Sequence, residues 1–210
     1  MFAADGKEQS GVWLARLDGT TPPRRLTTAN TWETYFGRAG EVVFVAMERG
    51  GAIVVYRVNE DGSGTEQLIT TPNVFPFSAS PDGEFVVAQD TREWSSLKVY
   101  PRGNRRPILV CETCSPPQGT APLPPDMSWS PDGRFTYLKF AGSTFALPLP
   151  AGKMLPVLPT SGFASKEAVA EFPGVRLVSD EPNVFAGPDP SIYAFTKVAT
   201  QRNIYRVSVH

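Results

Sequence analysis

The sequence predicts an all-β fold, a β-propeller of four-stranded blades, and two observations support it. First, the segment Ser128–Leu138 (SWSPDGRFTYL) recurs earlier in the chain as Ser78–Ala88 (SASPDGEFVVA). Each copy reads as strand, tight turn and strand, because Pro presets φ, Asp bonds its own backbone and Gly accepts a positive φ. Second, units of this kind follow one another at a spacing of roughly 40 to 57 residues, as propeller blades do. The structural turn residues are Pro81, Asp82 and Gly83 in the earlier copy and Pro131, Asp132 and Gly133 in the later one.

The composition is that of a globular protein with many turns. Of 210 residues, 41% are hydrophobic and 20% charged, and 21 prolines and 18 glycines suit short strands joined by turns. Basic and acidic residues nearly balance at a net charge of −1 without a basic stripe, which argues against a nucleic-acid partner. No apolar run is long enough to span a membrane, and residues 1–8 lack the apolar core of a signal peptide. We therefore expect no membrane contact by this chain itself.

The first two units follow from apolar runs and turn residues. We name the strands of a blade a to d from the propeller axis outwards. The first unit, residues 1–28, has strands b to d expected at Met1–Ala4, at Val12–Leu17 and in a stretch ending at Thr27. The second unit, residues 32–71, has strands expected at Thr34–Gly37, Val42–Met47, Ile53–Val58 and Glu66–Thr70.

The third and fourth units each contain one of the repeated turns. Strands of the third, residues 74–111, are expected at Val74–Ser80, Phe85–Gln89, Leu97–Tyr100 and Pro107–Val110. Strands of the fourth, residues 125–159, are expected at Asp126–Ser130, Phe135–Phe140, Thr144–Leu149 and Met154–Leu158. A short helix near residues 165–172 follows, with Ser165 as its N-cap and Pro173-Gly174 at its end.

The last unit, residues 175–210, is incomplete. Gly187-Pro188-Asp189-Pro190 aligns with the two Ser-Pro-Asp-Gly turns, and strands b and c are expected at Ile192–Thr196 and Asn203–Val207. The end lacks a strand d and the start lacks a strand a, whereas a propeller closes when its N-terminal strand completes the last blade. We expect about four and a half blades of a six- or seven-bladed ring, and the alternative is a five-bladed ring with an irregular seam.

Propeller topology places the d–a and b–c loops on one side, the loop face. Trp32, Arg92, Trp94 and Arg202 are expected there, together with the loop that carries the two cysteines. Aromatic and arginine side chains on loops suit recognition of a protein, a peptide or a small ligand. The alternative is that the tryptophans pack over the blades as structural covers.

Cys111 and Cys114 are the only cysteines and His210 is the only histidine. A structural zinc site needs about four ligands, so we expect no metal. A redox motif would need a helix to lower the thiol pKa, whereas Pro116-Pro117 follows. A local disulfide is the preferred interpretation, and free thiols are the alternative.

The sequence contains no catalytic set. The aspartates Asp82, Asp132 and Asp189 occupy positions where the turn itself needs them. No Gly-x-Ser-x-Gly elbow, P-loop or kinase catalytic motif is present, and a lone histidine makes a Ser-His-Asp triad improbable. We therefore expect no enzyme activity and no cofactor in this chain.

The Ser-Pro-Asp-Gly hairpins resemble the WD-repeat-like units of TolB-family propellers over residues 32–207. The C-terminal segment resembles the ends of bacterial, notably acidobacterial, receptor-type serine/threonine kinases. That resemblance lies in Thr160–Phe163, Glu167–Phe172, Pro173–Val175, Tyr193–Phe195 and Gln201–Val207. It implies a parent protein with a cytoplasmic kinase domain, a membrane span and this propeller outside the cytoplasm, in the periplasm. None of the family's kinase residues maps onto this chain.

Three functions follow as hypotheses. The first is a non-catalytic binding or sensor module, the C-terminal propeller part of a larger protein such as a membrane serine/threonine kinase. The second is a free-standing TolB-like periplasmic scaffold, which would need a signal peptide upstream. The third is the propeller gate of a prolyl-oligopeptidase-like hydrolase, which would need a downstream hydrolase domain.

Overall fold

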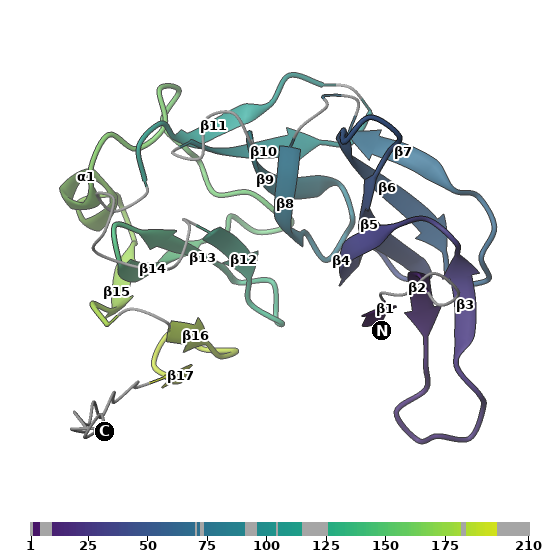
Figure 1. The fold of residues 1–210 in the computed structure, drawn as a ribbon. Helices are drawn as coiled ribbons and strands as arrows, with labels where there is room; N and C mark the ends of the chain where they lie inside the picture. The colour runs from purple at the N-terminus through teal and green to yellow at the C-terminus, as the bar shows by residue number, and fades with distance from the viewer. Residues whose placement is uncertain are drawn as a thin grey trace, which may run out of the picture.

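The computed structural model describes residues 2–4, 10–69, 71, 74–90, 96–103, 105–114, 126–181 and 184–196. In these ranges nearly all regular structure is β-strand, and the sheets follow one another along a curved arrangement (Figure 1). The first sheet has three strands: β1 (Phe2–Ala4), β2 (Gly11–Leu14) and β3 (Arg24–Thr27). The second has four: β4 (Thr31–Phe36), β5 (Glu41–Met47), β6 (Ile53–Asn59) and β7 (Glu66–Ile69).

The later sheets continue this order. The third sheet has β8 (Val74–Ala79), β9 (Phe85–Asp90), β10 (Leu97–Pro101) and β11 (Ile108–Cys111). The fourth has β12 (Asp126–Trp129), β13 (Phe135–Phe140), β14 (Ser143–Pro148) and β15 (Arg176–Ser179). The last described sheet pairs β16 (Val184–Ala186) with β17 (Tyr193–Phe195). Successive antiparallel four-stranded sheets, each ordered as in the sequence, make the fold propeller-like. The strand expected at Asn203–Val207 lies outside the described residues.

The strand expected at Met154–Leu158 is not formed, and this prediction was wrong. Residues 149–165 are irregular, and the fourth strand of that sheet is β15, which pairs with β14 through Phe145 and Leu177. Pro156 and Pro159 lack the N–H groups that a sheet ladder needs. The segment is held by other contacts, including the indole N–H of Trp129, which donates to the Met154 carbonyl at 2.7 Å.

Helix α1 spans Lys166–Ala170 and begins where the sequence predicts. The hydroxyl of Ser165 accepts the N–H of Ala168 at 3.2 Å, as an N-cap does. The helix ends two residues before Phe172, and Pro173 and Gly174 then turn the chain into β15. Gly174 takes a φ of 78°, which favours glycine.

The two repeated turns have the same hydrogen bonds. In both, the buried serine that precedes proline donates its hydroxyl to the aspartate, at 2.6 Å for Ser80–Asp82 and 2.7 Å for Ser130–Asp132. The same serine oxygen accepts the N–H of the residue that starts the next strand, at 3.0 Å in each case. Gly83 and Gly133 both take a φ of 67°, so the glycine is required. The shared Ser-Pro-Asp-Gly sequence therefore specifies the same turn geometry in both copies.

The aligned turn in the last unit keeps the strand register without the serine. The N–H of Gly187 donates to the carbonyl of Ile192 at 2.8 Å, which matches the Ser80–Phe85 bond at 2.8 Å. Asp189 stays in the aspartate role, but it accepts from the amide and hydroxyl of Ser191 at 2.9 and 2.7 Å. The alignment of Gly187-Pro188-Asp189-Pro190 with the earlier turns is thus correct at the level of the backbone.

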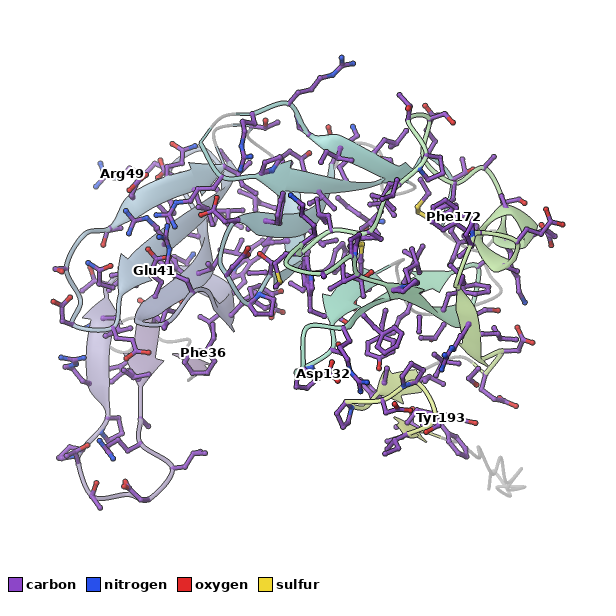
Figure 2. All side chains as sticks on the ribbon, turned by 180° about the vertical axis from the view of Figure 1, so that it is seen from behind. Phe36, Glu41, Arg49, Asp132, Phe172 and Tyr193 are labelled. Carbon is purple, nitrogen blue, oxygen red and sulfur yellow. A yellow bond between two sulfur atoms is a disulfide. The ribbon has the colours of Figure 1, made fainter. Side chains whose placement is uncertain are left out.

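Asp132 gives a pH dependence that can be measured. It lies on an exposed turn (Figure 2), and the hydroxyl of Ser130 and the N–H of Arg134 lower its pKa to about 2. Because the folded pKa lies below the ordinary value, the stabilisation is present above about pH 4 and is lost as the pH falls towards 2. We expect the free energy of unfolding, measured in urea, to fall less between pH 5 and pH 2.5 in Asp132→Asn than in the wild type. Equal losses in both proteins would contradict this.

Adjacent sheets are joined by single hydroxyl groups near the inner strands. The phenol of Tyr35 donates to the carbonyl of Pro76 at 3.0 Å, and Tyr137 donates to that of Gly187 at 2.9 Å. Ser78 donates to the carbonyl of Met127 in the same way between the third and fourth sheets. Burial raises the pKa of Tyr35, so its phenol keeps the proton that this bond needs.

Among the described residues, no helix is long and apolar enough to cross a membrane.

Candidate binding groove

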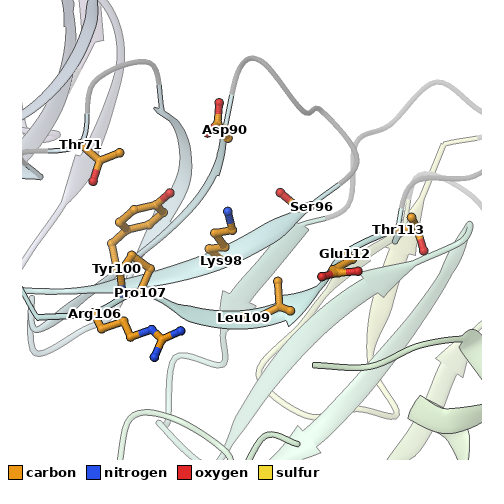
Figure 3. A pocket seen from close by; sticks show the side chains of 10 residues that line it. All are labelled: Thr71, Asp90, Ser96, Lys98, Tyr100, Arg106, Pro107, Leu109, Glu112 and Thr113. Atoms are coloured by element: carbon orange, nitrogen blue, oxygen red, sulfur yellow. The ribbon is translucent and has the colours of Figure 1, made fainter. Parts of the chain in front are cut away.

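A hollow of about 700 Å³ lies on the third sheet, beside the second sheet. Its walls come from β9, β10 and β11, from Thr71 after β7, and from the tip of the cysteine loop, as Figure 3 shows. A smaller hollow of about 260 Å³ adjoins it and is also lined by Leu68 and Ile69 of β7. The two share Thr71, Tyr100, Arg106 and Pro107, so we describe them together as the third-sheet groove.

Strand alternation decides which side chains enter the groove. Along β10, Leu97 and Val99 point into the core shared with the fourth sheet, whereas Lys98 and Tyr100 lie on the opposite face. Lys98 stands opposite Leu109 of β11 in the register, and both line the groove. The ring of Tyr100 also packs with residues of the second sheet, so this face turns towards that sheet.

Two cations of the groove have no ionic partner among the described residues. Lys98 is half-buried and Arg106 is exposed, and neither has an ion pair within the described part of the chain. Arg105, at the margin of the smaller hollow, pairs with Glu84 at 3.6 Å. Asp90 is buried at 7% exposure and is already engaged within the chain.

The hydroxyl of Ser96 is the unusual polar group of this site. Ser96 is 4% exposed, lines the groove at the start of β10, and its oxygen has no hydrogen-bond partner among the described residues. Most buried hydroxyl groups in proteins are hydrogen-bonded.

Cys111 and Cys114 form a disulfide that shapes one end of the groove. Their Cα atoms lie 5.7 Å apart, and both residues are fully buried. Glu112 and Thr113, between them, are exposed and line the groove. The disulfide therefore holds the backbone that presents these two side chains.

Breaking this disulfide should cost stability. For a loop this short, loss of the cross-link is worth about 2 kcal/mol in the chain-entropy account. We expect dithiothreitol to lower the free energy of unfolding in urea by about this amount. The double variant Cys111→Ala/Cys114→Ala serves as the control, since reductant should leave its stability unchanged. A wild type equally stable with and without reductant would show that the cross-link does not stabilise the fold.

The structure places one of the four predicted loop-face residues. Trp32 lies within β4 and not in a loop, because β4 begins at Thr31, which pairs with Ala46 of a long β5. Its side chain is 44% exposed and does not line the groove. Arg92, Trp94 and Arg202 lie outside the described residues, so their proposed role stays a prediction.

The groove residues are not among the binding residues predicted from the sequence. A signal was present: Lys98 is a lone charge in the otherwise buried strand β10, and Arg105-Arg106 comes directly before β11. Within the described ranges, no group of three or more His, Cys, Asp or Glu side chains is placed to hold a metal ion.

Comparisons with known proteins find similarity only in solved structures. No protein-family model and no curated protein matches the chain. The tricorn protease aligns with 82% of this chain and 15% of its own, at 11% identity and a TM-score of 0.36. A putative 6-phosphogluconolactonase from Bacteroides uniformis aligns with 62% of this chain and 41% of its own, at 21% identity and a TM-score of 0.31. The chain thus spans less than half the length of either protein, and neither similarity shows a shared family.

Proposed function

We propose that this chain is a non-catalytic binding module that holds a ligand in the third-sheet groove. The observation that carries the proposal is a groove lined by Lys98 and Arg106, neither of which has an ion pair in the described part of the chain. A hollow of about 700 Å³ is in the usual size range of ligand sites.

The parent protein we propose is a larger one, such as a receptor serine/threonine kinase with its propeller outside the cytoplasm. The chain would supply about four and a half blades of a six- or seven-bladed ring, related to TolB-like propellers. The resemblance of the C-terminal segment supports this parent, and the order of the sheets supports the propeller. The Cys111–Cys114 disulfide fits an oxidising compartment.

A steric block tests whether the groove is the binding site. Leu109→Trp would fill the groove without changing its charge, since Leu109 lies half-buried on the outer strand β11. Leu177→Trp is the matched control, because Leu177 is 52% exposed on β15, the outer strand of the fourth sheet. The probe is a phage-displayed library of random dodecapeptides, selected on the 210-residue chain, with thermal melts to verify that each variant folds.

The proposal expects enriched peptides that bind the wild type and Leu177→Trp and lose at least tenfold in affinity for Leu109→Trp. Peptides that bind all three proteins equally would place recognition elsewhere on the chain. A library that yields no enriched sequence would contradict a peptide-binding function of the groove.

A further inference from the structure

We propose that the occupant of the third-sheet groove is an extended acidic peptide segment, an inference that rests on the proposed function. Charge is the first argument. Lys98, Arg105 and Arg106 line the two hollows, and the first and last of these have no ion pair within the described residues. The acid that faces them, Asp90, is buried and already engaged. Glu112 is at the far end, on the cysteine loop.

The shape of the groove is the second argument. The groove continues from the smaller hollow, lined by Leu68 and Ile69 of β7, into the larger one. Tyr100 and Leu109 are apolar parts of its lining, beside the polar side chains that Figure 3 labels. A chain in extended conformation places alternate side chains on opposite sides. Apolar side chains of such a segment would pack against Tyr100 and Leu109, while acidic ones would reach Lys98 and Arg106.

The edge of the second sheet is the third argument. Strand β7 is the last of its sheet, so its outer edge has no partner strand in the described structure. Residues of this edge line the smaller hollow. By contrast, the outer edge of β11 is partly closed, because the N–H of Phe163 donates to the carbonyl of Val110 at 2.7 Å. An open edge that lines the groove suits a peptide that adds as a strand.

The contacts predict a binding mode that depends on salt. Arg106 is exposed, and ion pairs at exposed positions are screened as ionic strength rises. The affinity of an acidic peptide should therefore fall between 20 mM and 500 mM salt, while any contribution from packing against Tyr100 and Leu109 remains.

Three labelled peptides and one pair of variants test the inference by fluorescence anisotropy. The probes are fluorescein-labelled (Glu-Leu)₄, (Gln-Leu)₄ and (Lys-Leu)₄, which share length and apolar pattern. The test variant is Lys98→Glu/Arg106→Glu. Its matched control is Lys153→Glu/Arg49→Glu, which reverses an exposed lysine and an exposed arginine outside the groove (Figure 2 labels Arg49). Thermal melts of both variants verify folding.

The expected result is binding of the Glu peptide at low salt at least tenfold tighter than that of the Gln peptide. The groove variant should lose about tenfold or more in affinity for the Glu peptide, and the control variant less than twofold. If the Glu and Gln peptides bind equally and Leu109→Trp still blocks both, the ligand is not selected for acidic side chains. The inference would then be wrong, and the proposed binding function of the groove would still hold. If free glutamate competes as well as the Glu peptide, the groove does not require an extended peptide segment, and the inference would be wrong. Absence of binding by all three peptides would overturn the inference, and the library selection would then decide the binding function separately.

Discussion

Replacing Phe163 with alanine should lower the free energy of unfolding by about 3–5 kcal/mol, the usual loss for a fully buried phenylalanine. Phe163 is 2% exposed and belongs to the largest apolar cluster of the described structure, which joins the third sheet, the fourth sheet and α1. Its ring stands edge-on to that of Phe172 at 5.3 Å. Its N–H also bonds to β11. Truncation would leave a cavity where three elements meet.

The measurement is urea unfolding of the whole chain, followed by tryptophan fluorescence. Val157→Ala is the matched control, since Val157 lies on the same connection but is 72% exposed, and we expect a change below about 0.5 kcal/mol. Phe163→Leu should fall between the two, because it retains part of the buried volume. If Phe163→Ala were as mild as Val157→Ala, residues 149–165 would not be anchored in the core as the structure has them.

This anchoring also explains why the sequence misplaced the fourth strand. The run Met154–Leu158 has the apolar content of a strand and follows β14 directly, so a local pattern favours it. Contacts between distant residues decide whether this run or β15 pairs with β14. Leu155 and Leu158 pack into the cluster around Phe163, and the chain returns through α1 to the edge of β14. A prediction that takes the next apolar run after β14 as its partner strand therefore misses the more distant strand β15.

The turns were predictable because their geometry is local. Ser80, Asp82 and Gly83 bond within six residues of each other, so four letters of sequence specify the turn, its glycine φ and the register of the two strands. The same holds for the turn at Ser130. Most other strands were placed within a few residues for a related reason, since each is a short apolar run between turn residues.

The groove could not be predicted in the same way. Thr71, Lys98 and Arg106 come from different strands and connections, and only the packing of the second sheet against the third brings them to one hollow. The sequence pattern pointed to the loops, and Arg92 and Trp94 lie in the sequence between the groove residues Asp90 and Ser96. The available signals were the lone charge of Lys98 in a buried strand and the arginine pair directly before β11.

Glu41→Gln should be the most costly single change of charge in the described structure. Glu41 starts β5, is 8% exposed, and meets three arginines: Arg38 at 3.1 Å, Arg57 at 3.1 Å and Arg102 at 3.2 Å (Figure 2 labels Glu41). Arg38 and Arg57 belong to its own sheet, whereas Arg102 follows β10 of the third. One carboxylate therefore ties two sheets together.

Glutamine keeps the size of the side chain but removes the charge that Arg57 and Arg102 share. Both guanidinium groups are largely buried, at 17% and 18% exposed side-chain area, so water would solvate them poorly. Removing one partner of a buried charged cluster typically costs about 3–5 kcal/mol. Arg57 keeps Glu66 as a second partner, which should hold the loss near the lower end of that range. For a chain of this size, about 3 kcal/mol corresponds to a fall in Tm of about 6–12 °C.

Urea is the denaturant of choice for this measurement, because guanidinium chloride would screen the charges. Glu181→Gln is the matched control, since Glu181 is exposed and has no ion pair within the described residues, and we expect it to change stability by less than about 0.5 kcal/mol. A double-mutant cycle with Arg102→Gln then isolates the bond between the sheets. Strong coupling would mean that Glu41 acts through Arg102 and joins the second sheet to the third. Additive effects would mean that Glu41 stabilises only its own sheet. The contact between the second and third sheets, beside which the groove lies, would then depend on apolar packing around Tyr100.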